Sequence, residues 1–195
     1  MKTIMKVDIR TRIASAPSPA LRQAETAVQN LNTRTGRPDT AVDRSGNSFL
    51  IVSFGSGENA ALARAWIAEA AELGQVQWLT FSEINAETRR QLRQALASSL
   101  NGVRIMIVGR QFDVLQTVAL ARAAGALEKE VLSLVTNAVD LPIYCAHCRA
   151  TSSVVGGVGD VVTCPACDRT VEIHAHLSGV RGSYLASDAL ARELP

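Results

Sequence analysis

The sequence lacks the features that define several large classes of protein. No apolar run in its 195 residues approaches the length of about 18 residues that a membrane-spanning helix needs. The opening Met1–Lys6 segment carries charge, but no apolar core follows it as in a secretory signal. A Walker sequence, a Ser-His-Asp order and paired catalytic carboxylates are also missing. We therefore expect a protein that does not partner a membrane and has no catalytic motif of these kinds.

Excess positive charge is lacking as well. The net charge is only +2, and residues 141–195 hold four arginines and no lysine against five carboxylates. Zinc ribbons that bind nucleic acid use excess positive charge to displace counterions from phosphate. We therefore predict that nucleic acid is not a partner.

Cysteine is sparse, but its four copies are paired. The pairs Cys145/Cys148 and Cys164/Cys167 are separated by 15 residues. Two residues between cysteines allow a tight turn to aim both thiolates at one ion, and two such turns complete a tetrahedral sulfur site. This spacing is typical of a zinc site rather than of a disulfide framework. We predict one metal ion bound by all four cysteines, and reduced cysteines favour a cytoplasmic location.

Residues 1–47 differ in composition from the rest of the chain. They hold eight Lys and Arg against four acids, with prolines and a glycine that interrupt regular structure. We expect a partly flexible N-terminal arm, with room for a helix around Ala20–Leu31.

From Ser48 onward, short apolar runs alternate with amphipathic stretches. Strands are expected at 49–54, 75–81, 103–109 and 131–136, with a helix after each of the first three. Strands that alternate with helices in this way imply right-handed βαβ crossovers and a largely parallel sheet. We predict an α/β chain, with a Rossmann-like domain over 48–137. A small four-cysteine metal ribbon of zinc-ribbon or rubredoxin type, with its tail, is expected over 140–188.

The first predicted strand ends in a glycine turn that fits the pattern G-x-G-x-x-A over residues 55–60. In dinucleotide-binding folds, such glycines let the backbone approach a pyrophosphate at a helix N-terminus. The candidate cofactor-binding residues are Gly55, Gly57 and Ala60, together with Glu83 as a ribose-binding acid. However, Glu58 lies at the helix start and would repel phosphate, so a tight turn without a ligand is the alternative.

Two resemblances extend these predictions. Residues 48–136 resemble the nucleotide-binding half of ferredoxin reductase-type flavoenzymes, through the glycine turn and the strand and turn at 103–112. The chain has Asn59-Ala60 where those enzymes carry Thr/Ser-Pro, and Val108-Gly109-Arg110 where they carry Cys-Gly-Pro. The resemblance therefore implies the sheet more firmly than hydride transfer.

The segments 142–148, 164–167 and 174–185 resemble the C-terminal domain of the small subunit of bacterial dimethylamine monooxygenase. In that family the second cysteine pair is followed by a His-aromatic-Ser and Gly-Ala-Tyr type of tail; here Leu177 replaces the aromatic residue and Ser183 the alanine. The resemblance implies an accessory subunit that links a haem-containing oxygenase subunit to an FMN/iron–sulfur reductase subunit. Such systems demethylate secondary amines with NADPH and O₂.

Two alternatives stay open for the metal and for the tail. Zinc would make the site structural, whereas iron would make it an electron carrier; rubredoxins usually have glycine where this chain has Arg149 and Asp168. An NAD(P)H-dependent electron-transfer protein with a rubredoxin-type iron site is accordingly the alternative function. The tail offers four candidate residues for partner docking: His174, His176, Arg181 and Tyr184.

Overall fold

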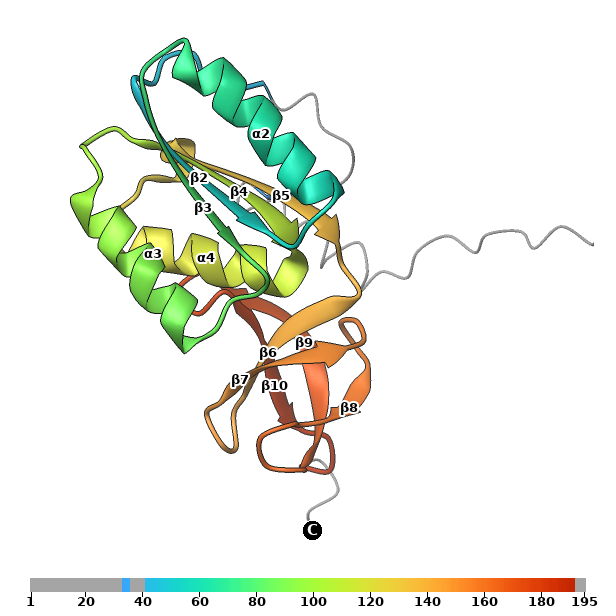
Figure 1. Ribbon diagram of the computed structural model, residues 1–195. Helices are drawn as coiled ribbons and strands as arrows, with labels where there is room; N and C mark the ends of the chain where they lie inside the picture. Colours follow the sequence, from blue (N-terminus) through green and yellow to red (C-terminus); the bar gives the residue numbers. More distant parts are fainter. Residues whose placement is uncertain (1–32, 36–40, 192–195) are drawn as a thin grey trace, which may run out of the picture.

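The computed structural model describes residues 41–191 and the backbone of residues 33–35. Most of the predicted arm, including the helix expected around Ala20–Leu31, lies outside these residues. The described part contains two five-stranded sheets, one above the other in Figure 1. No helix in this part is both long and apolar enough to cross a membrane.

The first sheet is parallel throughout, with the strand order β1-β5-β4-β2-β3. Four of its strands and all three α-helices match the sequence-based expectation within a few residues, so the parallel α/β prediction is confirmed. In chain order the elements are β1 (Thr33–Thr35), β2 (Ser48–Phe54), α2 (Glu58–Ala71), β3 (Gln75–Phe81), α3 (Ala86–Ser98), β4 (Arg104–Arg110), α4 (Gln111–Ala123), a 3-10 turn (Glu128–Glu130) and β5 (Val131–Asn137).

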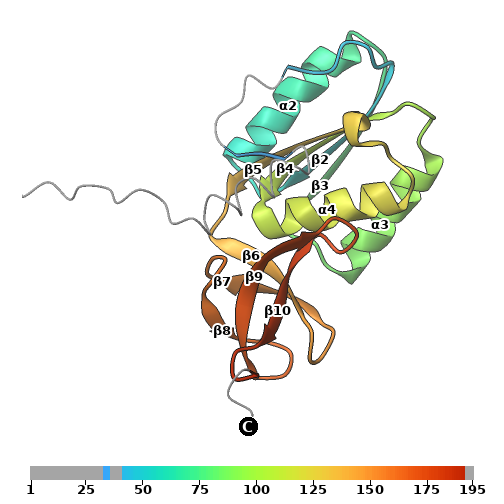
Figure 2. The ribbon, with the colours of Figure 1, turned by 180° about the vertical axis from the view of Figure 1, so that it is seen from behind.

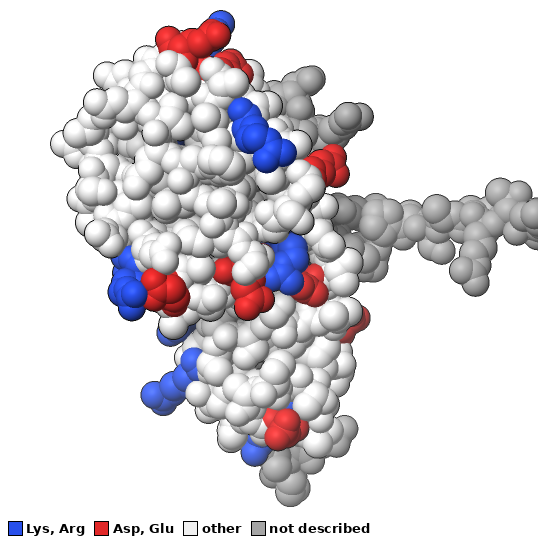
Figure 3. Space-filling view, viewed as in Figure 1, with Lys and Arg blue, Asp and Glu red and all other residues white. Residues whose placement is uncertain are grey.

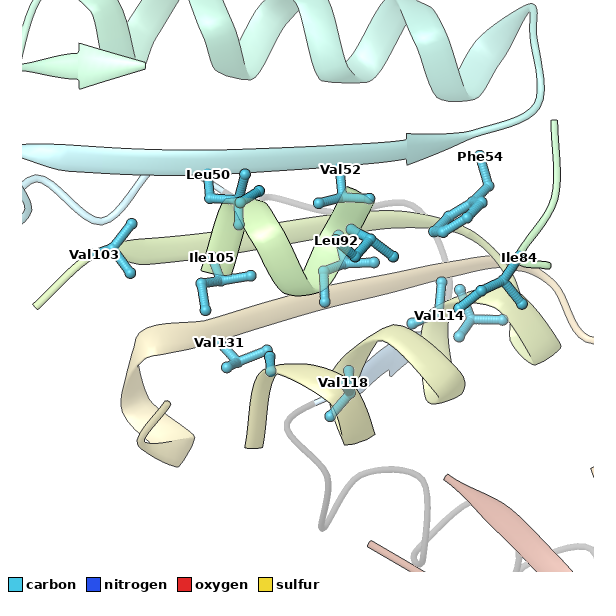
Figure 4. Close-up of a cluster of buried hydrophobic side chains, with 14 residues drawn as sticks. Leu50, Val52, Phe54, Ile84, Leu92, Val103, Ile105, Val114, Val118 and Val131 are labelled. Atoms are coloured by element: carbon cyan, nitrogen blue, oxygen red, sulfur yellow. The ribbon is translucent and has the colours of Figure 1, made fainter. Parts of the chain in front are cut away.

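Helices cover both faces of this sheet. Helix α2 lies on one face, and α3 and α4 lie on the other (Figure 1). The α3/α4 face holds a cluster of buried aliphatic side chains that includes Leu50, Ile105 and Val118 (Figure 4). Burial on both faces explains why β2 and β4 read as continuous apolar runs instead of alternating ones.

The start of α3 shows how the sequence sets a helix boundary. Asn85 accepts a hydrogen bond from the Thr88 backbone N–H at 3.0 Å through its side chain, and the Thr88 hydroxyl accepts one from the Asn85 N–H at 2.7 Å. This reciprocal capping box satisfies two N–H groups that a helix start would leave unpaired. Asn85 therefore marks the start of α3.

The second sheet has the order β7-β6-β10-β9-β8. Two hairpins, β6–β7 and β8–β9, are joined through β10, which pairs parallel with β6 and antiparallel with β9. Each hairpin turn carries one cysteine pair. The strands are β6 (Asp140–Cys145), β7 (Thr151–Val155), β8 (Val161–Thr163), β9 (Thr170–Ser178) and β10 (Ser183–Asp188).

Helix α4 holds the two sheets together. One side of it packs on β4 and β5, and the other side contacts β6 and β10, with Leu115 buried among the side chains of the second sheet. The Gln116 side chain donates hydrogen bonds to the carbonyl oxygens of Arg181 and Gly182, each at 2.8 Å. Figure 2 shows this loop between β9 and β10 lying against α4.

The contact leaves no room for a side chain at Gly182. A Cβ atom there would lie 2.3 Å from the Leu115 carbonyl oxygen, and its φ angle of +61° is one that residues with a side chain rarely adopt. Glycine is therefore required at this position by both the backbone conformation and the packing.

Ser183, the next residue, gives a testable prediction. Its side chain is fully buried, and its hydroxyl has no hydrogen-bond partner among the described residues. A buried, unpaired polar group costs about 1–3 kcal/mol. We expect Ser183→Ala to stabilise the protein by about 1 kcal/mol, which in a chain of this size raises Tm by roughly 2–4 °C.

Ser53 is the matched control, because it is equally buried but accepts a hydrogen bond at 3.2 Å from the Trp78 indole. Ser53→Ala should lower Tm in the same thermal unfolding assay. Equal losses in the two variants would show that the Ser183 hydroxyl has a partner.

Candidate metal centre

The two cysteine-bearing turns have the same backbone geometry. In the first, the Arg149 N–H donates to the Cys145 carbonyl oxygen at 2.8 Å and the Cys145 N–H donates to the Ala150 carbonyl oxygen at 3.0 Å. In the second, Asp168 and Cys164 form the equivalent bond at 2.9 Å, and Cys164 and Arg169 form the other at 2.9 Å. The two turns therefore present their thiols in the same way.

Arg149 and Asp168 occupy the positions where rubredoxins usually have glycine. Their φ angles are +63° and +56°, and they are the non-glycine residues with positive φ in the described part of the chain. The turn thus requires the left-handed conformation at this position, whichever residue supplies it. Arg149 and Asp168 therefore adopt the backbone conformation that glycine favours.

The four sulfur atoms fit a tetrahedral ion. They all lie within 4.8 Å of one another. The Cys145–Cys167 pair is 3.9 Å apart and the Cys148–Cys164 pair 3.8 Å. Metal–sulfur bonds of about 2.3 Å in a tetrahedron place sulfurs about 3.8 Å apart, whereas a disulfide needs about 2.05 Å. The geometry supports a metal site formed by the predicted cysteines, and the four-thiol chemistry suits zinc or iron.

Electrostatics give the same answer. Burial raises the pKa of Cys145, but hydrogen bonds from the Cys148 and His147 N–H groups outweigh burial and lower the pKa overall. The Arg169 N–H lowers the pKa of Cys167, yet burial and the other three thiols raise it to about 12. Burial also raises the pKa of Cys164. Coulomb repulsion opposes four thiolates this close together, so a bound cation would be needed to hold them.

The charged neighbours of the site have separate roles. Arg169 pairs with Asp188 on β10, and the pKa of Asp188 is lowered by the Leu190 N–H and then by this arginine. Arg149 and His147 are exposed. The pair between Arg169 and Asp188 therefore ties the second cysteine turn to the strand that joins the two hairpins.

The predicted docking residues lie at different depths. His174 is half-buried, with its Nε2 atom 2.7 Å from the Ser187 hydroxyl, and His176 is exposed on the same strand. Arg181 is exposed, and its guanidinium stacks 4.0 Å from the ring centre of Tyr144. Tyr184 is fully buried in the second sheet, and this burial raises its pKa to about 12. The side chains of Arg181 and His176 are therefore accessible to a partner, whereas the side chain of Tyr184 is part of the core.

The glycine turn lies at the carboxyl edge of the first sheet, where the strand order reverses between β2 and β4. This is where doubly wound folds bind ligands. Gly55 and Gly57 have positive φ angles of 81° and 64°. The Asn59 side chain turns back to donate to the Phe54 carbonyl oxygen at 2.7 Å, and Glu58 occupies the first helical position.

Acidic groups dominate the neighbouring strand end. The Arg110 guanidinium lies 3.0 Å from Asp113, 3.3 Å from Asp140 and 3.9 Å from Glu83. Burial lowers the pKa of Arg110, but the bond to Asp113 and the other two carboxylates raise it overall. Figure 3 shows basic and acidic atoms together near the junction of the two sheets. Three carboxylates around one guanidinium leave a net negative site that disfavours phosphate.

Within this cluster Glu83 is the exposed member, and the other two carboxylates connect separate parts of the fold. Asp113 is fully buried and also accepts the Ile84 N–H at 2.8 Å, while Asp140 begins β6. The cluster therefore joins the first sheet to the start of the second. Sequence reasoning missed it and missed Gln116, because the partners are up to 66 residues apart along the chain and no local pattern connects them.

A groove of about 350 Å³ lies at the opposite, amino edge of the first sheet. It is lined by the ends of α3 and α4 and the start of β4, including Leu100, Val103 and Leu127. It is thus remote from the glycine turn and from the cysteines.

Comparisons with known proteins agree with the cysteine turns and the tail. Residues 142–186 match the family described as dimethylamine monooxygenase subunit DmmA-like, C-terminal domain. The second sheet of this chain is therefore similar to the C-terminal domain of DmmA-like subunits. Over 143 residues it is 29% identical to the heme-dependent oxidative N-demethylase delta subunit of Ectopseudomonas mendocina (strain ymp), with 71% of this chain and 78% of that protein aligned. No solved structure matches it significantly. The matched DmmA-like region contains all four cysteines.

The candidate four-cysteine site predicts a metal stoichiometry. Purified protein should contain about one metal ion per chain, and Cys145→Ser should release it because three thiols no longer complete the tetrahedron. Metal analysis checks the content. Amide hydrogen exchange should become fast in β6–β10 while β2, β4 and β5 stay protected.

His147→Ser is the matched control in the same turn, because His147 is exposed and the four sulfurs are left intact. This variant should keep its metal. Metal loss in His147→Ser, or full metal content in Cys145→Ser, would contradict a four-sulfur site.

The glycine turn predicts weak nucleotide binding. We expect calorimetric titration with NADPH to give no Kd below roughly 1 mM, equivalent to about 4 kcal/mol. The physical reason is the negative charge of Glu58 at the helix N-terminus and of the cluster around Arg110. Micromolar binding that Gly57→Val abolishes would instead identify a coenzyme site.

Proposed function

We propose that this protein is a non-catalytic small subunit of a heme-dependent oxidative N-demethylase, where it holds a haem-containing oxygenase subunit and an FMN/iron–sulfur reductase subunit together. One observation carries the proposal. The segment matched by the DmmA-like family, 142–186, covers nearly the whole second sheet with its four cysteines. A secondary amine such as dimethylamine would be the substrate of the assembled system.

The second sheet is suited to presenting a surface. Its strands are three to nine residues long. Its buried cluster contains Cys145 and Cys164, and Cys148 and Cys167 pack against this cluster. A sheet this small has little apolar core, so a metal ion that fastens two hairpins supplies stability that packing cannot. The metal then stabilises the fold of the second sheet, and the partner subunits catalyse the reaction.

We propose zinc as this metal. Zinc has no redox chemistry and prefers four thiolates in structural sites. Exposed Arg149 lies next to the first turn and would offset part of the thiolate charge. An iron site would absorb visible light and bleach on reduction, whereas a zinc site is colourless. A visible spectrum of protein from its native host, with elemental analysis, separates the two.

The loop between β9 and β10 is the proposed contact with partner subunits. Its backbone is fixed to α4 through Gln116, and its tip carries the exposed Val180 and Arg181. The stack of Arg181 on Tyr144 holds the guanidinium in place without covering it. A rigid loop with an apolar residue beside an arginine loses little entropy on binding, which favours an interface anchor.

Assembly tests this function. Co-expression with an oxygenase and a reductase subunit of this class should give one complex in gel filtration. Arg181→Ala should weaken the complex by roughly tenfold in Kd, about 1.4 kcal/mol, because an anchor at the loop tip is lost. Its metal content should stay unchanged.

Arg149→Ala is the matched control, since it removes an exposed arginine from the same sheet while leaving the sulfurs in place. This variant should assemble like the wild type. If the wild-type chain elutes alone while the other two subunits keep full NADPH-driven demethylation, the accessory role is wrong.

A further inference from the structure

Strand β3 is an unusual edge. The two sheets end in four edge strands, β1, β3, β7 and β8, among the described residues. β1 and β8 have three residues each and β7 has five, but β3 has seven. Soluble proteins protect long edges with charges, prolines or bulges. The β3 sequence QVQWLTF contains no charge and no proline, and its pairing with β2 runs without a register shift.

The outward-facing backbone groups of β3 follow from its two ends. The Gln75 N–H donates to the Asn47 carbonyl oxygen at 3.0 Å, and the Phe81 carbonyl oxygen accepts the Gly55 N–H at 2.8 Å. Both residues therefore direct their backbone groups toward the β2 side. Because these groups alternate along a strand, Val76, Trp78 and Thr80 direct theirs to the open edge.

We propose that this edge binds a second copy of the same chain, with β3 paired antiparallel to β3 of the other copy about a two-fold axis at Trp78. Trp78 is the central residue of the strand. In this register Trp78 pairs with its own equivalent and Val76 pairs with Thr80, so every outward N–H and C=O of both copies gains a partner. The result is one continuous ten-stranded sheet.

The side chains fit this arrangement. Trp78 is 40% exposed, and its indole N–H donates a hydrogen bond to the buried Ser53 hydroxyl at 3.2 Å. Two such rings would lie side by side across the axis and shield each other from water. The uncharged strand places no like charges opposite each other, and the surface around β3 in the upper left of Figure 3 is largely free of charge.

Symmetry favours a second copy over a different protein. A two-fold interface is self-complementary: the same patch must serve as both partners. Strand β3 has an odd number of residues, and the N–H and C=O groups of its central residue face the open edge. It meets this requirement because the outward-facing groups are distributed evenly on both sides of the axis. The inference concerns the chain by itself and is independent of the proposed function.

Lysine and glutamate substitutions of Trp78 test whether the two β3 strands pair about this residue. The wild-type chain should have twice the mass of 20.8 kDa in light scattering after gel filtration at micromolar concentration. W78K and W78E should each run as monomers, because two lysines or two glutamates would face each other across the axis. An equimolar mixture of the two variants should recover the dimer, since opposite charges then meet.

A matched pair of strand variants gives a second test. Thr80→Lys adds a charge to the open edge and should weaken dimerisation at least about tenfold, in line with the way charged residues protect edges. Thr170→Lys makes the same change at an exposed position of β9 and should leave the dimer intact. Circular dichroism and metal content should confirm that each variant is folded.

Amide exchange identifies the occupant. The amides of Val76, Trp78 and Thr80 should be protected in the wild type and exchange rapidly in W78K. A wild-type monomer whose β3 amides are protected would mean that another segment of its own chain covers the edge. A monomer whose β3 amides gain protection only with a partner subunit would assign the edge to that subunit. Either result, or a W78K/W78E mixture that stays monomeric, overturns the proposal.

Discussion

The second sheet depends on how the negative charge of four neighbouring cysteine sulfurs is balanced. Four thiol sulfurs that lie within 4.8 Å of one another would repel one another strongly if all of them were ionised. A divalent ion would remove this repulsion, and structural zinc contributes about 10–16 kcal/mol in small peptides. That is comparable to the whole stability of an ordinary domain. The turns, the joining strand β10 and the tail that follows are therefore the parts of the chain that one bound ion would hold together.

Helix α4 extends this dependence to the first sheet. Most of its residues are buried because it has protein on two sides. The Arg89 guanidinium donates to the Gln116 side chain at 2.7 Å, and Gln116 in turn holds the carbonyl oxygens of the tail loop. A single amide thereby connects α3, α4 and the loop that we propose as the subunit contact. The Arg110 cluster provides a second connection at the start of β6.

The sequence predicts the local features well, because local physics produces them. The alternation of apolar runs with amphipathic stretches locates the parallel strands and the helices, and the cysteine spacing locates the four residues of the candidate metal site. The rest depends on contacts between residues far apart. Neither the burial of Tyr184 nor the role of Gln116 is visible without the fold, because both arise where the tail meets α4. Glu83 illustrates the same limit: its position after β3 predicts ribose binding, and its proximity to Arg110 at 3.9 Å is seen only in the fold.

Strand β1 has a consequence for how the chain folds during synthesis. It pairs with β5 in the register Thr33 to Ser133, a separation of 100 residues. The ribosome adds about 5–20 residues each second, so β1 waits several seconds after synthesis before its neighbour exists. Throughout that interval β2, α2, β3, α3, β4 and α4 can form between them. The earliest described strand to be made is thus among the last to find its place in the sheet.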